Sequence, residues 1–243
     1  MENKITLKGK IIIKGKIKTK TGLHIGGTAE TLKIGGSDNP VIRDKNGRVF
    51  IPGSSLKGKI RSLLEIKDGK YKYNNGEAQP CNCGEKDCYI CMLFGPHKSD
   101  NIKEPSRVIV RDAYLDLPDG KTVYDHLETK PENVIDRVKG TAQHPRFIER
   151  VVAGSEFNYE VVFNIYKEKD KELIKKFIEG MKLLEDDYLG GSGSRGYGKI
   201  KFEKLKAIYK PKEYYEGDMD KMVEKPEIDD LDELIKLINE INF

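Results

Sequence analysis

Apolar and polar residues alternate along much of the chain, which is the period of a β-strand with one buried face. Residues 5–19 place isoleucines and a leucine at one parity and mostly lysines at the other, and residues 157–165 alternate in the same way. Apolar runs at 107–115 and 199–208 predict two further strands. The pattern therefore indicates four strands, the first of which has one basic face.

Two segments have the 3.6-residue spacing of an amphipathic helix. The first begins at residues 52–55 and runs to about Glu65, with a serine available as its N-cap, and the second spans residues 168–185. Ahead of the first helix, the turn sequence Asp44–Gly47 predicts a hairpin within residues 41–51. The order β-α-β-β-α-β predicts an α+β fold of the ferredoxin-like, RRM-like kind, which also builds RNA-recognition domains.

Polar segments interrupt this order and predict two insertions into a single domain, residues 1–243. Residues 67–104 are irregular and contain every cysteine, whereas residues 117–156 carry turn signals typical of a protruding segment. Pro211 is expected to end the regular core and to leave residues 212–243 as an acidic tail. A helix in this tail would dock on the chain's own core or on a partner through Leu231, Leu234, Ile235, Ile238 and Ile241.

Composition excludes the membrane and secreted classes of protein. No run approaches the roughly 20 apolar residues of a membrane helix. Lysines stand near the N-terminus, where a secretory signal needs apolar residues. We therefore expect a cytoplasmic protein.

The net charge of +4 hides a strong asymmetry along the chain. Residues 1–62 contain 14 lysines and arginines against 4 acids, whereas residues 213–243 contain 3 lysines against 11 acids. A basic third indicates a polyanionic partner, and nucleic acid is the commonest one. A solvated lysine-rich face would give the same composition, so both interpretations stay open.

The four cysteines lie within eleven residues, as Cys81-x-Cys83 followed by Cys88-x-x-Cys91. Such clustering in a polar loop of a cytosolic protein predicts a tetrahedral zinc site rather than disulfides. Four thiolates leave no open position, so the zinc is expected to be structural. His97 is near enough in sequence to replace one cysteine.

Two glycine runs, residues 53–59 and 193–199, fit the spacing G-x-x-x-x-G-K of a nucleotide loop. In both, isoleucine follows the lysine where a P-loop needs Ser or Thr for Mg²⁺, so a nucleoside triphosphatase is disfavoured. The runs make better backbone cradles for RNA phosphates, with tight helix–strand turns as the alternative. The cations available there are Lys57, Lys59, Arg61 and Arg195.

His24 and Asp38 are the candidate polar residues of the first glycine-rich loop. His24 could contact a base or a phosphate, or could be a loop histidine with its hydrogen bonds satisfied. Asp38 is a carboxylate in the most basic third of the chain, where it could hold a divalent cation or accept a proton from an attacking hydroxyl. Residues 37–40 are equally good as a turn, so a purely structural role for Asp38 stays open.

Taken together, these motifs resemble the RAMP superfamily. The resemblance is closest to the repeated backbone subunits of type III-A CRISPR effector complexes, the Csm complexes. It extends over residues 5–210 and includes Glu132–Arg137. The blocks that carry it are Thr21–Gly27, Ser37–Val41, Ile51–Lys59 and Leu189–Lys199.

The resemblance implies an RRM-like domain that forms a filament with further copies of itself along a guide (CRISPR) RNA, together with other Csm subunits. Residues 117–156 would be the thumb, a hairpin that interrupts the guide–target duplex. Asp38 matches the aspartate that cuts complementary target RNA at regular intervals with a divalent cation such as Mg²⁺. RNA contacts are expected from His24, Lys57, Lys59, Arg61, Arg137 and Arg195. The cysteine segment, which only some relatives have, would be a zinc-stapled lid.

Two other functions stay open at this point. A guide-processing ribonuclease of the same superfamily would cut precursor RNA as a single subunit, and it usually needs histidine for acid–base chemistry, for which only His24 is well placed. A non-catalytic RNA scaffold would use Asp38 only as a turn residue.

Overall fold

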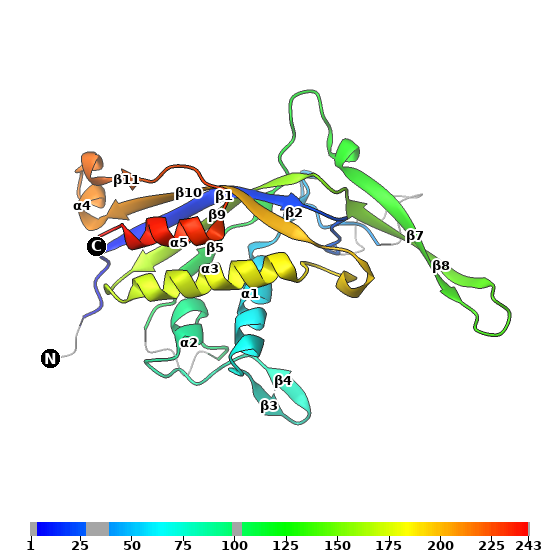
Figure 1. Cartoon of the computed structure of the whole chain (residues 1–243), viewed down its shortest axis with the longest axis horizontal. Coiled ribbons are helices and arrows are strands. Elements are labelled where there is room, and N and C mark those ends of the chain that lie inside the picture. The colour runs from blue at the N-terminus through cyan, green and yellow to red at the C-terminus, as the bar shows by residue number, and fades with distance from the viewer. Residues whose placement is uncertain (1–3, 28–38, 99–103, 243) are drawn as a thin grey trace.

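A five-stranded antiparallel sheet is the centre of the computed structural model, which describes residues 4–27, 39–98 and 104–242 (Figure 1). The strands lie in the order β11-β10-β1-β9-β5, and each neighbouring pair is antiparallel. Their bounds are β1 Gly9–Thr19, β5 Val108–Val110, β9 Glu156–Ile165, β10 Ile200–Pro211 and β11 Val223–Glu224.

Two long helices connect the strands and pack on one face of the sheet. The first, α1 (Gly53–Lys67), lies between β1 and β5 in the chain, and α3 (Asp170–Asp186) lies between β9 and β10. The core order β1-α1-β5-β9-α3-β10 is the predicted one, and the mixed α+β class is confirmed. Among the described helices, none has the length and apolar character needed to cross a bilayer.

The period of two in the strands separates a buried face from a charged face. Alternate residues of β1, β9 and β10 point to the helices and are fully buried, including Ile11, Ile13, Ile17, Val161, Phe163, Phe202 and Ala207. They form one core with Leu56, Ile60 and Leu64 of α1 and Phe177, Ile178 and Met181 of α3. Burial of this apolar surface is the main force that holds the sheet against the helices.

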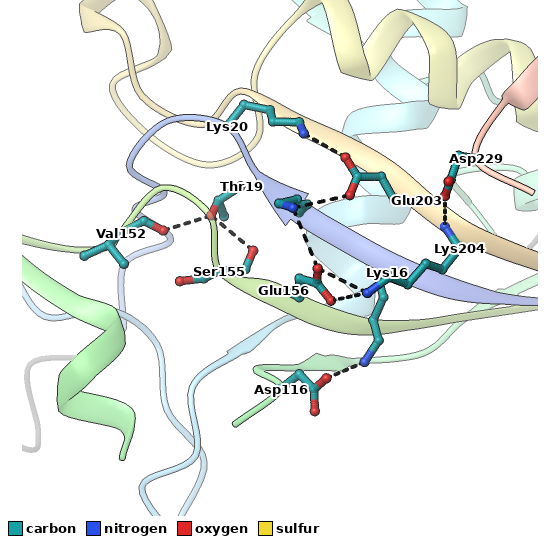
Figure 2. A network of polar contacts seen from close by, with 11 residues as sticks. Lys16, Thr19, Lys20, Asp116, Val152, Ser155, Glu156, Glu203, Lys204 and Asp229 are labelled. Atoms are coloured by element: carbon teal, nitrogen blue, oxygen red, sulfur yellow. Dashed lines mark hydrogen bonds and ion pairs between the residues drawn. The ribbon is translucent and has the colours of Figure 1, made fainter. Parts of the chain in front are cut away.

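The opposite face of the sheet corrects the expectation of an open basic surface. Figure 2 shows Lys16, Lys20 and Lys204 reaching carboxylates on neighbouring segments. The ion pairs of this face include Lys14–Glu160, Lys16–Asp116, Lys18–Glu156, Lys18–Glu203, Lys20–Glu203, Lys204–Glu156 and Lys206–Glu224. Of the lysines of β1, Lys14, Lys16 and Lys18 therefore face acids from other parts of the chain, and their charge is largely balanced.

Residues 67–98, the described part of the cysteine segment next to α1, are more ordered and more buried than their polarity predicts. They contain a short hairpin, β3 (Lys72–Asn74) with β4 (Glu77–Gln79), and a helix, α2 (Tyr89–Phe94). Ile90, Leu93 and Phe94 of α2 are buried, and the ring of Phe94 lies 6.1 Å from that of Phe177 in α3. The described part of this segment therefore extends the core instead of forming a detached loop.

Local details around α1 also differ from the prediction. The predicted serine cap is wrong, because Pro52 precedes α1 and the Asp112 carboxylate accepts the Gly53 amide at 2.7 Å. Asp112 separates β5 from β6 (Ala113–Tyr114), so residues 107–115 form two strands instead of one. The predicted turn is present, since Asp44 accepts backbone hydrogen bonds from Asn46 and Arg48. It precedes β2 (Phe50–Ile51), which pairs with β6.

Residues 117–156 contain a long hairpin that projects from the end of the molecule opposite α4 and β11 (Figure 1). Its strands are β7 (Leu127–Ile135) and β8 (Ala142–Val151), and they pair antiparallel. Ile148 and Val151 are buried at its base, whereas the outer part is exposed on both faces. The protruding segment expected at this place in the sequence is therefore present.

The C-terminal segment packs on its own chain. It forms α4 (Lys212–Tyr215), β11 at the sheet edge and α5 (Leu231–Asn239). The predicted amphipathic helix is confirmed, with Leu231, Leu234, Ile238 and Ile241 buried in the main core and Ile235 packed against it. Pro211 ends β10 but does not end the regular structure.

A buried ion pair ties the sheet to the start of α3. Arg107 is only 1% exposed, and its Nε lies 3.3 Å from Oδ1 of Asp170, which is also buried. The other oxygen of Asp170 accepts the backbone amides of Tyr166 and Lys167 at 2.8 and 3.0 Å. Glu104 completes the set by accepting from Arg107. Removing Arg107 would leave the buried Asp170 carboxylate without a counterion, whereas Arg107 would keep Glu104 if Asp170 were removed.

We expect Arg107→Met to lower the free energy of unfolding by roughly 3–5 kcal/mol, because Asp170 would stay buried without its cation. Denaturant titration followed by circular dichroism measures this loss. The matched control is Lys175→Met, which removes the surface ion pair with Glu172 and should cost less than about 1 kcal/mol. Equal losses in the two variants would contradict a special role for the buried pair.

Candidate nucleic-acid interface and metal centre

The chain after β1 carries the candidate His24 past the loop 189–199, called here the glycine loop, which carries the candidate Arg195. The amides of Gly198 and Gly191 donate to the carbonyls of Gly22 and His24, each at 2.9 Å. On its other side, Leu23 exchanges two backbone hydrogen bonds with Val151 of β8. Residues 22–24 are therefore held between the glycine loop and the base of the β7–β8 hairpin.

This close passage requires glycine at particular positions. A Cβ on Gly190 would lie 2.3 Å from the carbonyl oxygen of His24, and Gly190 has a φ of +77°. A Cβ on Gly193 would lie 2.0 Å from the ring of Tyr188. Any side chain at either position would displace its neighbours. These glycines thus serve the chain's own tight packing, whatever ligand the loop also meets.

His24 is half-buried beside β8. Its Nδ1 is 2.7 Å from the carbonyl oxygen of Glu149, and since a carbonyl only accepts, Nδ1 carries the donated proton. In the neutral ring this leaves Nε2 as an acceptor, near the exposed Gly26. The structure therefore uses one ring nitrogen for the fold and leaves the other toward the surface.

Asp38 lies outside the described residues, but the described residues on either side of it in the chain, Gly27 and Asn39, are both hydrogen-bonded at this same place. The Gly27 amide donates to the Pro40 carbonyl at 3.1 Å, and the Glu149 amide donates to the Asn39 carbonyl at 3.1 Å. The Glu149 carboxylate accepts from the Val41 amide at 2.9 Å. The residue that follows Asp38 is therefore bonded to the strand residue whose carbonyl accepts from His24.

A concave groove of about 480 Å³ runs between the hairpin and the glycine loop. Two residues predicted separately to bind RNA, Arg137 of the hairpin and Arg195 of the glycine loop, both line it. Lys130 and Arg146 also line it, and sequence reasoning missed both. The available signal was that both basic residues lie in the segment singled out as protruding. The one carboxylate in the lining is Glu132.

The lysines of α1 lie on the other side of the glycine loop. Lys59 is 3.1 Å from the Asp187 carboxylate and 3.9 Å above the ring of Tyr188, which packs on Gly193. Lys57 is half-buried, and burial, followed by repulsion from Arg61, lowers its pKa. Within the described residues it has no ion-pair partner. Since residues 53–59 are continuous helix, they do not form the phosphate loop of a nucleoside triphosphatase.

Arg61 faces the cysteine segment instead of the glycine loop. Its guanidinium donates to the carbonyls of Cys81 and Gly95 at 2.7 and 3.0 Å, and to the Glu65 carboxylate at 2.8 Å. Glu65 also accepts the Cys81 amide at 2.9 Å. With its side chain only 15% exposed, Arg61 is placed to join α1 to the cysteine segment. The other described candidates for RNA contact lie elsewhere.

The four cysteines form a compact cluster of sulfur atoms. Cys81 Sγ lies 3.7, 3.7 and 3.8 Å from the sulfurs of Cys83, Cys88 and Cys91, and Cys83 lies 3.8 Å from Cys91. A tetrahedral zinc with Zn–S bonds of about 2.3 Å requires sulfurs about 3.8 Å apart. The cluster therefore fits zinc. His97 is not in the ligand group, and its backbone amide donates to Cys81.

The cluster belongs to the main core. Cys81, Cys88 and Cys91 are buried in the same apolar cluster as α1 and α3. Burial raises the pKa of the Cys91 thiol to about 11, and it raises the pKa of Cys88 as well. A bound cation would stabilise the thiolates that burial disfavours, so metal and fold are expected to depend on each other.

Comparison with known families gives a consistent result. The RAMP superfamily model matches residues 16–201. A relative from Methanocaldococcus jannaschii, named CRISPR system Cms endoribonuclease Csm3, is 66% identical over 99% of this chain and 97% of its own length. A relative of the same name from Streptococcus thermophilus is 43% identical over 82% of this chain and 89% of its own length.

Comparison with solved structures identifies the same family. The crystal structure of the Csm3–Csm4 subcomplex of the type III-A CRISPR-Cas interference complex contains a chain of 54% identity with a TM-score of 0.71. That match covers 98% of this chain and 99% of the other. Methanopyrus kandleri Csm3, at 21% identity and a TM-score of 0.61, shares the fold.

Freshly purified, reduced protein should contain one zinc per chain, as measured by plasma mass spectrometry. The double variant Cys88→Ser with Cys91→Ser should lose the metal. Because these residues lie in the main core, we expect the free energy of unfolding of this variant to fall by about 3 kcal/mol or more. Its Tm should then fall by roughly 6–12 °C. Zinc returned after chelation should restore the Tm of the parent but not of the variant. Reduced protein without any metal would rule out the zinc site.

Proposed function

Because the chain belongs to the Csm3 family of the RAMP superfamily, we propose that it binds guide RNA and cuts complementary RNA within a type III-A CRISPR interference complex. The relatives are named endoribonucleases, and the solved relative is seen in a subcomplex with Csm4. By the same reasoning this chain would work beside other Csm subunits and further copies of itself along one guide.

In this proposal the domain is a ferredoxin-like, RRM-like core with two functional insertions. The order β10-β1-β9-β5, with a helix in each crossover, supports that core. The β7–β8 hairpin within residues 117–156 would be the thumb, and the cysteine segment within 67–104 a zinc-stapled lid. Since α2 and three of the cysteines are buried in the core, this lid would be a fixed part of the domain.

The observation that carries the proposal is the convergence of cations where the middle and outer part of the hairpin face the glycine loop. Lys130, Arg137, Arg146 and Arg195 line one groove, in which Glu132 is the one acidic residue. An excess of cations in a concave site attracts the phosphates of RNA, whereas a surface of balanced ion pairs does not. We therefore place RNA along the groove and the glycine loop. We do not place it on the ion-paired face of the sheet opposite α1 and α3, called here the helix-free sheet face.

The neighbours of the groove supply the other contacts. The outward nitrogen of His24 and the unpaired ammonium of Lys57 would meet the guide, with Lys59 reaching phosphate if it leaves Asp187. Arg61 would act on RNA only through the position of α1, because its donors are used by the cysteine segment.

Asp38 would supply the chemistry of cutting. Its chain neighbour Asn39 is bonded to Glu149, whose carbonyl accepts from His24, so the residue next to Asp38 in the chain lies at the proposed RNA site. A carboxylate near RNA phosphates is repelled by them unless a cation lies between. A divalent cation such as Mg²⁺ would polarise the scissile phosphate, and Asp38 would hold that cation or accept the proton of the attacking hydroxyl.

RNA binding by the groove should show a steep dependence on salt. If about six phosphates are neutralised, raising salt from about 50 to 200 mM should weaken binding of single-stranded RNA roughly 300- to 1000-fold. Arg146→Gln, in the groove, should lower the slope of log affinity against log salt by about one. Lys206→Gln, on the sheet face, is the control and should leave it unchanged. A smaller slope in Lys206→Gln with an unchanged slope in Arg146→Gln would show that RNA binds the sheet face instead of the groove.

Asp38→Asn should abolish cutting by the assembled complex and leave guide RNA bound. Asparagine serves a turn nearly as well as aspartate but has no charge, so a turn role would be preserved. The rate of target cleavage on a gel should fall by at least about a hundredfold, with equal or slightly tighter guide binding. Asp44→Asn, at another turn of the same basic third, is the matched control. It should cut at the parental rate.

The same assay separates the alternatives. A guide-processing enzyme would cut precursor RNA without other subunits and would depend on His24 more than on Asp38. A scaffold would cut nothing in either form. An Asp38→Asn complex that cuts as fast as the parent would show that the nuclease site is not in this loop.

A further inference from the structure

Glu132, in the middle of β7, is the meeting point of three side chains from two parts of the fold. The Tyr197 hydroxyl of the glycine loop donates to its carboxylate at 2.9 Å. The Arg195 Nε lies 3.3 Å from the other oxygen, and the Lys130 ammonium lies 3.8 Å away. The carboxylate is only 10% exposed, although the hairpin around it is open to solvent.

Tyr197 is built into this place by the glycine loop. It lies between Gly196 and Gly198, which have φ values of +84° and +77°, and the residue is only 1% exposed. Lys130 and Arg150 of the hairpin lie 4.6 and 4.8 Å from its ring centre. Burial, and then the nearby Glu132, raise the pKa of Tyr197, so its hydroxyl keeps the proton that it donates.

Within the described residues, Glu132 is also the outermost point at which the hairpin is bonded to the rest of the molecule. At the base, β8 is fixed by the Leu23–Val151 and Asn39–Glu149 hydrogen bonds. Beyond the 132–146 pair, residues 133–145 form hydrogen bonds and ion pairs only among themselves, within the part of the chain that the structure describes. On each side of the hairpin about six residues, including half of the turn, lie beyond this contact, so the tip extends roughly 15–20 Å past it.

Resting on the function proposed above, we infer that the Tyr197–Glu132 hydrogen bond is a positioning contact that sets the angle of the hairpin against the glycine loop. A rotation of the hairpin about its outermost contact moves everything beyond that contact. It would therefore displace residues 133–137 on the hairpin side of the groove relative to Arg195 on the glycine loop. The bond thereby sets where the target strand lies relative to the cutting residue. Tyr197 and Glu132 act through the hairpin and need not touch the scissile phosphate.

The three partners of Glu132 differ in how easily RNA could take them away. Arg195 is 52% exposed, so a phosphate in the groove can attract its guanidinium. Tyr197 is buried and neutral, so a phosphate in the groove does not attract its hydroxyl away from Glu132. The hydroxyl therefore keeps Glu132 in place when the arginine turns to RNA, and the hairpin keeps its angle in the loaded state.

The test measures the hairpin angle and the cut positions separately. Spin labels on non-canonical amino acids at Val138 and Lys175 avoid the cysteines and report the distance from hairpin tip to α3 in the assembled complex. Tyr197→Phe removes only the hydroxyl, and Tyr124→Phe, at an exposed tyrosine near the hairpin base, is the matched control. Glu132→Gln keeps an acceptor for Tyr197 but loses the charge that holds Arg195 and Lys130.

We expect Tyr197→Phe to broaden the distance distribution and to lower cutting at the parental positions about tenfold or more, which is what one hydrogen bond to a charged group supplies. New cut positions should appear while guide binding stays close to the parent, and loss of this one hydrogen bond should lower Tm by only about 3–6 °C. In both the width of the distance distribution and the cutting at parental positions, Glu132→Gln should lie between Tyr197→Phe and the parent. Tyr124→Phe should match the parent in both.

An unchanged distance distribution in Tyr197→Phe would overturn the inference. So would a broadened distribution with unchanged cut positions, because the hairpin angle would then not matter for cutting. A parental complex that cuts no RNA would instead overturn the proposed function, while the distance measurement would still decide whether the bond fixes the hairpin.

Discussion

The proposed RNA site of this molecule depends on the close passage of residues 22–24 against the glycine loop. The Gly190 backbone comes so near the His24 carbonyl that no side chain fits between them. That passage places His24 against Glu149, orders the hairpin base through Leu23 and Val151, and brings Tyr197 under Glu132. Without it, the hairpin would have few ties to the core.

Electrostatics then decides which surface can serve RNA. The ion pairs on the sheet face opposite the helices are partly open to solvent, and each contributes about 1 kcal/mol or less to stability. Their larger effect is on the electrostatic potential of this surface, because Glu156, Glu160 and Glu203 offset the positive charges of Lys14 and Lys18. The groove beside the hairpin keeps an excess of cations. The charge that the sequence places in its first third is thus less available to a polyanion than the charge of the hairpin.

The sequence predicts what depends on local patterns and misses what depends on register. The periods of two and 3.6 identify β1, β9 and α3, and cysteine spacing identifies a ligand set that fits zinc. Charge balance along the chain could not show that Glu203 lies opposite Lys16, since that follows from strand pairing. The short α2 was missed because its six residues lie in a polar segment. Tyr197 and Glu132 are 65 residues apart, and only the fold brings them together.

The most direct test of the account is to map where the guide touches this chain. Guide RNA carrying 4-thiouridine would be photo-crosslinked in the assembled complex, and the modified peptides identified by mass spectrometry. The account predicts crosslinks in the glycine loop at 189–199, in the hairpin at 130–146 and on α1 around Lys57. Crosslinks concentrated in β1 at 10–18 and β10 at 201–206, on the ion-paired sheet face, would contradict it.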